Sequence, residues 1–382
     1  PHLYDGSLEC EHCGEIGCIR CSPHWYWEAG VVFMTQSRRR DNPFGGINIT
    51  ATTTVPDGMG GVVTITVDNL QSLLSVGSAE SNFHAGPRVT FGRYLGTDEH
   101  GLDAFADFTY YGINDWNETA QRVGEVVTRT TDDGMGTVTV VQEGNLRTLF
   151  FQGNLETAFN NATVHQLSYI SDLDNFEFNV RLKREARGRD QLVLVPGGDW
   201  FPGHSVNKFA TTFSGDEDFR LVSRGNQIVA VNGVITQVNQ NFGQYVVLAD
   251  NDMFGGQMGL MGQYVANNWD VGIRGQAAVM ANFSEQFTNT FVQLINNGVV
   301  NTSASAHSDR GLSAAVLGEV GLVGSYQVLP NVRLRGRWDF MWLGGLALAP
   351  DQVVNDENAR KPINDEGVIF YSGGGVSAEV VW

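Results

Sequence analysis

A strict two-residue alternation ends this chain, and it restricts the fold more than any other feature of the sequence. From Gly374 onward one face of the expected strand carries apolar residues: Val376, Ala378, Val380 and the terminal Trp382. The opposite face carries Ser377 and Glu379. Successive side chains of a strand point to opposite faces, and a strand between lipid and a polar lumen needs this division. The ending predicts a membrane strand with an aromatic C-terminal signal; the alternative is an edge strand of a soluble sandwich.

The same alternation recurs along the whole chain. It predicts strands at 25–36, 86–95, 102–112, 175–183, 250–264, 269–283, 309–328, 332–345 and 367–382, with a less regular one at 190–201. No run of eighteen apolar residues occurs, which excludes a membrane-spanning helix. The pattern therefore predicts about ten strands, and two further crossings within 202–249 would raise the number to twelve.

Short and long connections alternate between these strands. The long ones are expected at 37–85, 113–172, 202–249, 284–308 and 346–366. Short periplasmic turns and long extracellular loops are the arrangement of bacterial outer-membrane barrels. The sequence thus predicts an all-β, transmembrane antiparallel up-and-down β-barrel over 25–382, in the outer membrane of a Gram-negative cell and in contact with its lipid. Residues 1–24 form a separate N-terminal segment.

The charge balance narrows the possible partners. The chain has 24 Lys and Arg against 42 Asp and Glu, a formal net charge of −18. This balance argues against nucleic acid as a partner. The acidic residues cluster in Gly- and Asn-rich segments, which are typical of solvated surface loops; bound calcium is the alternative. The partner of the outer loops is not specified by the sequence.

Four cysteines lie within twelve residues of the N-terminal segment: Cys10, Cys13, Cys18 and Cys21. Their nested spacing suits a small hairpin that would bring Cys10 opposite Cys21 and Cys13 opposite Cys18. That geometry allows two intrachain disulfides or four zinc ligands. An oxidising compartment favours disulfides, within one chain or between subunits, and leaves zinc as the alternative. No other cofactor is expected.

Charged residues also gather on the inward face of the expected strands. The set comprises Glu28, Asp103, Asp107, Glu177, Arg181, Lys183, Arg274, Glu319, Arg333, Arg335, Arg337 and Asp339. Ten tilted strands enclose a backbone cylinder only about 20 Å across, which side chains largely fill. A hydrogen-bonded ionic plug is therefore favoured over a conducting pore. The eight histidines are scattered and show no catalytic spacing, so we expect no enzyme.

Three stretches resemble a known family: Asp252 to Gly259, Gly275 to Asn282, and above all Gly318 to Gln352, which ends in Ala349-Pro350-Asp351-Gln352. They are similar to the planctomycete outer-membrane proteins of the beta-barrel porin 7 family. The resemblance is strong over 250–382 and absent from the long connections. It implies an outer-membrane location and a porin-like protein, and it implies no substrate or catalytic residue.

These observations predict an integral outer-membrane protein, porin-like, that forms a homo-oligomeric assembly at the cell surface and has a narrow or plugged lumen. The glycines Gly318, Gly324 and Gly336 face lipid in this scheme and would allow subunits to approach closely. The first alternative is a passive diffusion porin for small solutes. The second is a secreted, soluble β-rich adhesin.

Overall fold

Ten strands close into one antiparallel barrel in the computed structural model, which describes residues 25–38, 43–56, 62–75, 82–97, 102–132, 136–148, 150–184, 204–266, 268–355 and 362–382. Around the ring they are β1 (Trp25–Arg38), β4 (His84–Thr97), β5 (Leu102–Val123), β9 (Val164–Arg184), β10 (His204–Val231), β11 (Val234–Ala266), β12 (Trp269–Asn296), β13 (Val299–Leu329), β14 (Val332–Leu346) and β15 (Gly367–Val381). Pairing of β1 with β15 and of β10 with β11 completes the ring. The predicted fold class and the ten strands are confirmed. Within the described ranges, no helix has the length and apolar character to span a bilayer.

The strands extend much farther than the sequence pattern indicated. The tenth strand, expected at 190–201, lies outside the described residues, and the strand that pairs with β9 is instead β10 at His204–Val231. The expected loops at 202–249 and 284–308 are hairpins: β10 to β11, and β12 to β13. Both turn at an Asn-Gly pair with positive φ, 50° and 77° at Asn232 and Gly233, and 50° and 81° at Asn297 and Gly298. Such pairs match the twist of a tight hairpin.

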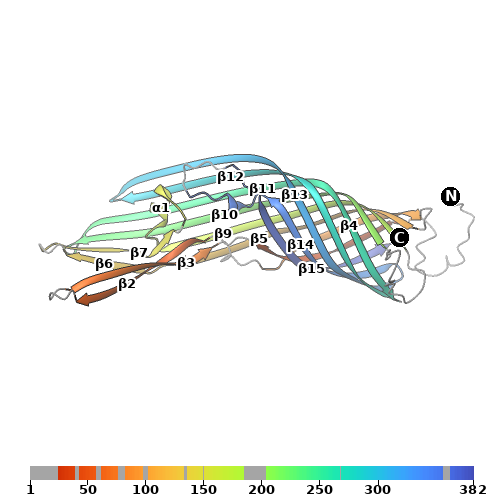
Figure 1. The fold of residues 1–382 in the computed structure, drawn as a ribbon, viewed down its shortest axis with the longest axis horizontal. Coiled ribbons are helices and arrows are strands. Elements are labelled where there is room, and N and C mark those ends of the chain that lie inside the picture. Colours follow the sequence, from red (N-terminus) through yellow and green to blue (C-terminus); the bar gives the residue numbers. More distant parts are fainter. Residues whose placement is uncertain are drawn as a thin grey trace, which may run out of the picture.

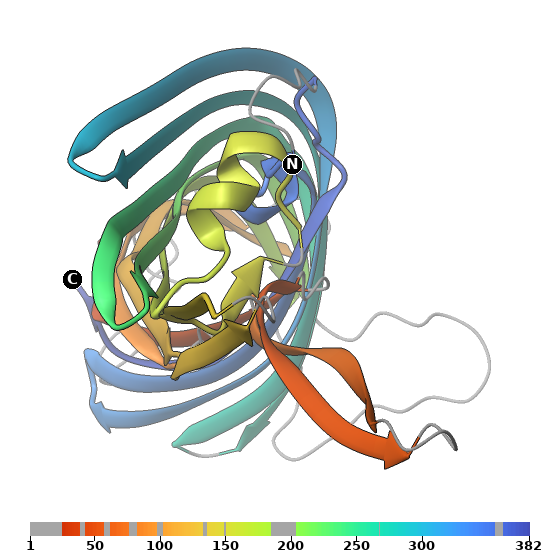
Figure 2. The ribbon, with the colours of Figure 1, turned by 90° about the vertical axis from the view of Figure 1, so that its left-hand side faces the viewer.

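Smaller elements lie at the end of the barrel opposite the start of β1 and the end of β15 (Figure 1). The expected loop at 113–172 contains the end of β5, β6 (Val126–Asp132), β7 (Val138–Gly144), β8 (Leu146–Thr148), α1 (Gly153–Phe159) and the start of β9. The expected loop at 37–85 contains β2 (Pro43–Pro56) and β3 (Val62–Ser75), which form a second sheet with β8. The connection at 346–366 contains the 3-10 helix η2 (Ala349–Gln352). Figure 2, viewed from this end, shows α1 inside the ring of strands.

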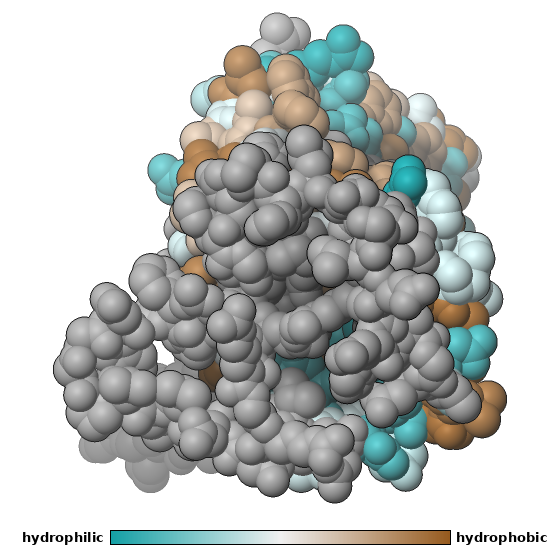
Figure 3. Space-filling view, turned by 90° about the vertical axis from the view of Figure 1, so that its right-hand side faces the viewer, coloured by the Kyte–Doolittle hydropathy of each residue, from teal (hydrophilic) through white to brown (hydrophobic). Residues whose placement is uncertain are grey.

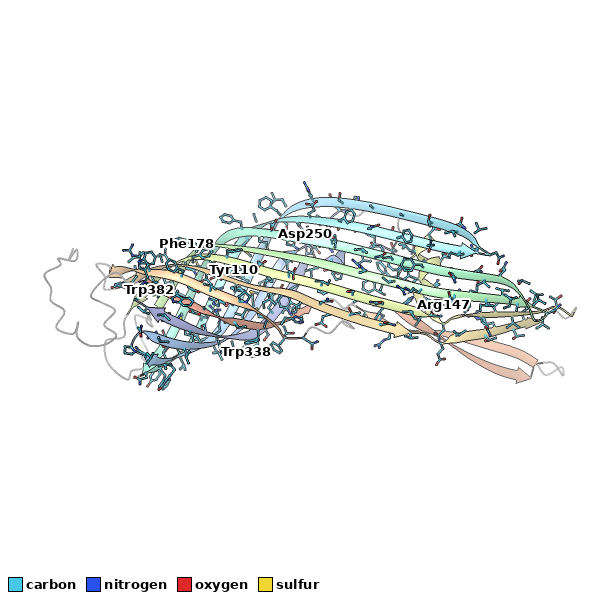
Figure 4. The ribbon with its side chains drawn as sticks, turned by 180° about the vertical axis from the view of Figure 1, so that it is seen from behind. Tyr110, Arg147, Phe178, Asp250, Trp338 and Trp382 are labelled. Carbon is cyan, nitrogen blue, oxygen red and sulfur yellow. The ribbon has the colours of Figure 1, made fainter. Side chains whose placement is uncertain are left out.

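A band of large apolar side chains covers the outer wall of the half that holds the start of β1 and the end of β15. It includes Trp27 and Phe33 on β1, Phe178 on β9, Ile273 on β12 and Trp338 on β14, all more than 40% exposed. Phe178 and Trp338 lie in the same half of the barrel as Trp382 (Figure 4). Figure 3 shows hydrophobic residues on the outer wall at this end, interspersed with hydrophilic ones. A closed barrel with an apolar exterior belongs in lipid, so the protein lies in the outer membrane, and a secreted soluble adhesin is not compatible with this exterior.

Charged side chains mark the outer limit of the apolar band. On β9, Asp174 lies two residues farther from the membrane than Phe176. It accepts a hydrogen bond of 2.7 Å from the Tyr110 hydroxyl. On β12 and β13, Glu285 and Arg310 form an exposed ion pair at 2.9 Å, two residue pairs beyond Phe283 and Leu312. At the end that holds Trp382, β11 joins β12 and β13 joins β14 by short turns close to the apolar band. At the opposite end the strands extend far beyond the band, and outer-membrane barrels carry their larger parts outside the cell, so the end with Trp382 faces the periplasm. The extended strands, α1 and η2 lie beyond the limit, on the cell surface.

Candidate functional site

The inner face of the barrel forms three layers, and the layer nearest the periplasm is ionic. The carboxylate of Glu28 accepts hydrogen bonds from the Ser377 hydroxyl at 2.7 Å and from Arg335 at 3.1 Å. Arg335 also pairs with Glu379 at 2.6 Å. The Nε atom of Arg88 lies 4.0 Å from Glu28. Four neighbouring strands of the ring, β14, β15, β1 and β4, are therefore linked on their inner face by one set of charges.

A second group in the ionic layer joins β1, β5 and β9. The carboxylate of Asp107 accepts hydrogen bonds of 2.9 Å from the Tyr26 hydroxyl and from the Asn179 amide. Arg181 pairs with Asp107 and donates to the Tyr26 oxygen. Asn179 also donates to Glu177 at 3.3 Å. Asp107 and Glu177 are almost fully buried, so these bonds replace the water that a buried carboxylate needs.

A third group lies on β12, β13 and β14. Arg274 pairs with Asp339 at 2.9 Å and with Glu319, which also accepts a hydrogen bond from Gln276. Arg337 is 3.7 Å from Asp339. Each buried carboxylate here faces a guanidinium, which is the condition for keeping charges out of water.

The structure places most of the predicted lumen charges in these groups. Arg333 lies opposite Glu379 on the neighbouring strand and is half-buried. Asp103 and Lys183 are paired across β5 and β9, but their side chains lie outside the described residues. The same holds for Cys10, Cys13, Cys18 and Cys21. Sequence reasoning missed four polar members of the layer, although alternation in the predicted strands places each of them inward: Tyr26, Arg88, Asn179 and Gln276.

In the closing strand, the residues predicted to face lipid lie on the outer wall and those predicted to face the lumen lie inside. Val376 and Trp382 are exposed on the outer wall, and Ala378 and Val380 are partly exposed beside them. Glu379 is buried inside, and Ser377 bonds to Glu28 as described above. The register with β1 runs from Tyr26 opposite Val381 to Arg38 opposite Ile369 without a shift. The last strand therefore closes the ring along its whole length.

An apolar layer lies next to the ionic layer, on its extracellular side. It is made of inward-facing, almost fully buried side chains from eight strands, among them Met34, Trp116, Met253, Met280, Met341 and Tyr371. The Trp116 indole donates to the Met34 carbonyl at 3.3 Å, and its ring centre lies 5.7 Å from that of Tyr371. The Tyr111 hydroxyl contacts the Met341 sulfur at 3.8 Å. Flexible methionines fill irregular gaps well, so this layer is packed rather than hollow.

The outermost layer is a second apolar core built around α1. Leu155 and Phe159 of the helix are fully buried against strands β9 to β12. The Phe151 ring lies 4.7 Å from Phe159 and 5.2 Å from Tyr245. Burial raises the pKa of Tyr245 to about 12, and a hydrogen bond from the Val354 amide opposes that rise. Tyr245 therefore stays neutral and fixes the chain that follows η2.

His165 holds the end of α1. Its Nε2 atom lies 2.8 Å from the Phe159 carbonyl oxygen, so the neutral ring donates to that carbonyl. Burial lowers the pKa of His165 to about 4, and the carbonyl opposes the shift. The ring is therefore uncharged at neutral pH.

Amide side chains clamp the connection between β14 and β15 inside the barrel. Asn251 accepts from the Ala347 amide at 2.8 Å and donates to the Ala347 carbonyl at 2.9 Å. Gln352 makes the same pair of bonds with Asn364, at 2.8 and 2.6 Å. Pro350 and Gln352 are buried. The Ala-Pro-Asp-Gln stretch thus forms an inward-folded part of the outer core.

Two further features bear on what the molecule can bind. A groove of about 780 Å³ lies along β1 and β12 to β15. Its lining includes the outward-facing Phe340, Trp342 and Phe370 together with the inward-facing Gln276, Glu319, Met341 and Tyr371. Among the described residues, no group of three or more His, Cys, Asp or Glu could hold a metal ion.

Comparison with known proteins finds similar solved structures but no matching family. No family model and no curated protein matches the chain. Among solved structures it is similar to the outer membrane protease OmpT of Escherichia coli, with 7% identity over 94% of this chain and 97% of that one and a TM-score of 0.33. It is also similar to a FadL homologue of Pseudomonas aeruginosa, with 7% identity over 94% of this chain and 90% of that one and a TM-score of 0.23. With an anion-selective porin of Comamonas acidovorans it shares 9% identity over 94% of this chain and 99% of that one, at a TM-score of 0.15. At these TM-scores the similarities carry no argument about function.

Proposed function

We propose that this chain is a plugged outer-membrane barrel that builds a homo-oligomeric assembly at the cell surface and does not conduct solutes. One observation carries the proposal: the lumen is filled in three successive layers. Charges fill the periplasmic third, methionine and aromatic side chains fill the middle, and α1 with η2 fills the outer end. A solute would have to displace all three.

The size of the ring supports the same conclusion. Ten strands enclose a cylinder about 20 Å across between backbones. Arginine, methionine and aromatic side chains that point inward from opposite walls meet across that width. The contact from Tyr111 to Met341 joins β5 to β14, which three other strands separate on the ring. A continuous water path of solute width does not fit beside such contacts.

Three finer points belong to the proposal. The resemblance of Gly318 to Gln352 supports membership of the beta-barrel porin 7 family. The N-terminal cysteines form disulfides, within one chain or between neighbours, with zinc as the alternative. The protein has no catalytic role: His165 is held by a backbone carbonyl, and His84 lies 3.4 Å from Glu118, which also accepts from the Asn82 amide.

Conductance of single molecules in planar lipid bilayers tests the plugged lumen. Folded protein, verified by heat-modifiable migration on gels, is expected to give no steps above the baseline. Steady ohmic steps would instead support the alternative, a passive diffusion porin. The assembly is tested by the mass of the detergent-extracted particle: several copies are expected, and a single copy would contradict it.

A further inference from the structure

The outer part of β13 has a strand neighbour on one side. Strand β12 pairs with β13 from Val299 to Tyr326, whereas β14 reaches only from Val316 to Leu329. Closer to the membrane, Asp309 accepts a hydrogen bond from the Ile363 amide. The connection between β14 and β15 therefore covers β13 at this point. Within the described residues, Val299–Ala304 pairs only with β12. We call this stretch the β13 edge; it offers about 20 Å of backbone.

A hairpin projects from the opposite side of the molecule. Strands β2 and β3 pair with each other along their whole length. Apart from β3, the only described strand that pairs with β2 is β8, at Gly45, Gly46 and Ile47. At its base, Phe44 packs against Phe150. Figure 2 shows this hairpin standing away from the ring, at the lower right, while the tip of β12 and β13 lies at the upper left. Among described strands, the part of β2 from Asn48 to Thr53 therefore pairs only with β3.

The composition of both stretches suits strand pairing. The β13 edge reads Val-Val-Asn-Thr-Ser-Ala, and residues 48–53 of β2 read Asn-Ile-Thr-Ala-Thr-Thr. Neither contains a charge or a proline, although 17% of the chain is charged. Proteins normally protect open edges with lysine, proline or bulges, because an unprotected edge pairs with another strand. An edge without such protection indicates a strand partner.

The membrane fixes how two copies can meet. All copies in one membrane have the same orientation, so strands of neighbouring copies keep their direction relative to the bilayer. Strand β13 runs toward the membrane from its tip, and β2 runs away from it (Figure 1). The two would therefore pair antiparallel, the more common arrangement. Two β13 edges could not do so, since both run toward the membrane.

We propose that the β13 edge of one copy binds strand β2 of the next copy, and that this contact builds the homo-oligomer. The inference rests on the assembly in the proposed function and names its surface. Because the two surfaces differ and lie on opposite sides, the contact is head-to-tail, which produces rings or open filaments. Backbone hydrogen bonds supply the affinity, as in other cases of strand addition.

A photo-cross-linking residue placed at Thr302 tests the contact in intact outer membranes. The expected product joins two copies, and mass spectrometry locates the cross-link within residues 43–75. A product that joins Thr302 to another segment, or no product while the particle still holds several copies, overturns this inference and leaves the assembly standing. A particle with one copy overturns both.

Two lysine variants provide a matched comparison. Thr302→Lys places a charge on the β13 edge and is expected to shift the sedimenting particle toward single copies and to abolish the cross-link made from a probe at Thr50. Asn289→Lys places the same exposed charge on β12, between two paired strands, and is expected to leave the particle unchanged. Equal sedimentation of both variants and the wild type overturns the inference.

Discussion

Replacement of Arg274 by methionine removes the cation that holds two buried carboxylates. Its guanidinium pairs with Asp339 at 2.9 Å and with Glu319, and these side chains are only 5% and 4% exposed. Loss of one partner from a buried pair costs about 3–5 kcal/mol, because the remaining charge has no compensation. Arg274 itself is 20% exposed, so water screens part of the loss. We expect the lower end, about 3 kcal/mol.

Urea titration of the folded barrel in detergent micelles measures this loss through tryptophan fluorescence and heat-modifiable migration. Arg310→Met is the matched control, since Arg310 also pairs with a carboxylate at 2.9 Å, but on the outer wall with 78% of its side chain exposed. Exposed pairs contribute little, so this variant should unfold with the wild type. The double variant Arg274→Met, Glu319→Gln should lose less than the sum of the two single losses, because the second change removes the carboxylate charge that the first left without its cation.

The reasoning fails if Arg274→Met unfolds at the same urea concentration as the wild type. It also fails if the two single losses add in the double variant. Either result would mean that the ionic layer fills the lumen without holding the strands together, and that barrel closure depends on backbone pairing alone.

Two further predictions concern the outer core. The pKa of His165 is about 4 in the folded protein and about 6.5 in the unfolded chain. As the pH falls, the unfolded chain therefore binds the proton first. The contribution of neutral His165 to the free energy of unfolding is complete above about pH 6.5, and about 3 kcal/mol of it is lost as the pH drops to 4. Hydrogen exchange of residues 150–165 should accelerate over this range, and His165→Gln should remove that dependence; an unchanged pH profile in the variant would contradict the assignment. Gly243→Val would place a Cβ atom 2.7 Å from the Phe159 ring and 2.9 Å from Ala158, an overpacking cost of about 1–3 kcal/mol that should expose α1 to protease. Gly262→Val, whose Cβ meets open space, is the control, and equal cleavage of both variants would count against a packed α1.

The sequence predicted the membrane part because lipid imposes a simple rule on it. Trp27 and Phe33 face outward and Glu28 and Met34 inward, so β1 shows the division directly. The same rule predicted that charged side chains such as Asp107 and Glu319 point into the lumen, because their strands were predicted correctly. Arg88 lies in a predicted strand as well, and the alternation places its side chain on the inner face.

The same rule failed beyond the membrane. On β13 the outward positions change from Leu312 to Arg310 and then to small or polar residues such as Ser308, so the apolar half of the alternation disappears while the strand continues. Strand β10 was missed for a similar reason, since polar residues occupy much of its length. Helix α1 is only seven residues long, too short for helical periodicity to stand out against its surroundings. Its burial depends on β9 to β12, which are distant in sequence.

The place where the barrel ceases to be closed explains why assembly and membrane position are connected. In hydrocarbon every backbone group must be paired inside the protein. Strand β13 has strands on both sides from Val316 to Leu329, where the exterior is apolar. Between Val316 and Arg310, Gly345 and Ile363 lie against Ala314 and Gly311, so the end of β14 and the connection to β15 cover this part of β13. Above the Glu285 and Arg310 pair the surroundings are aqueous, and water can satisfy an edge that lipid could not. The one-sided pairing of Val299–Ala304 is therefore permitted only on the cell surface. It is also the part of the barrel that a neighbouring copy can reach without entering the bilayer, so the membrane itself restricts strand pairing between copies to the outer ends of the strands.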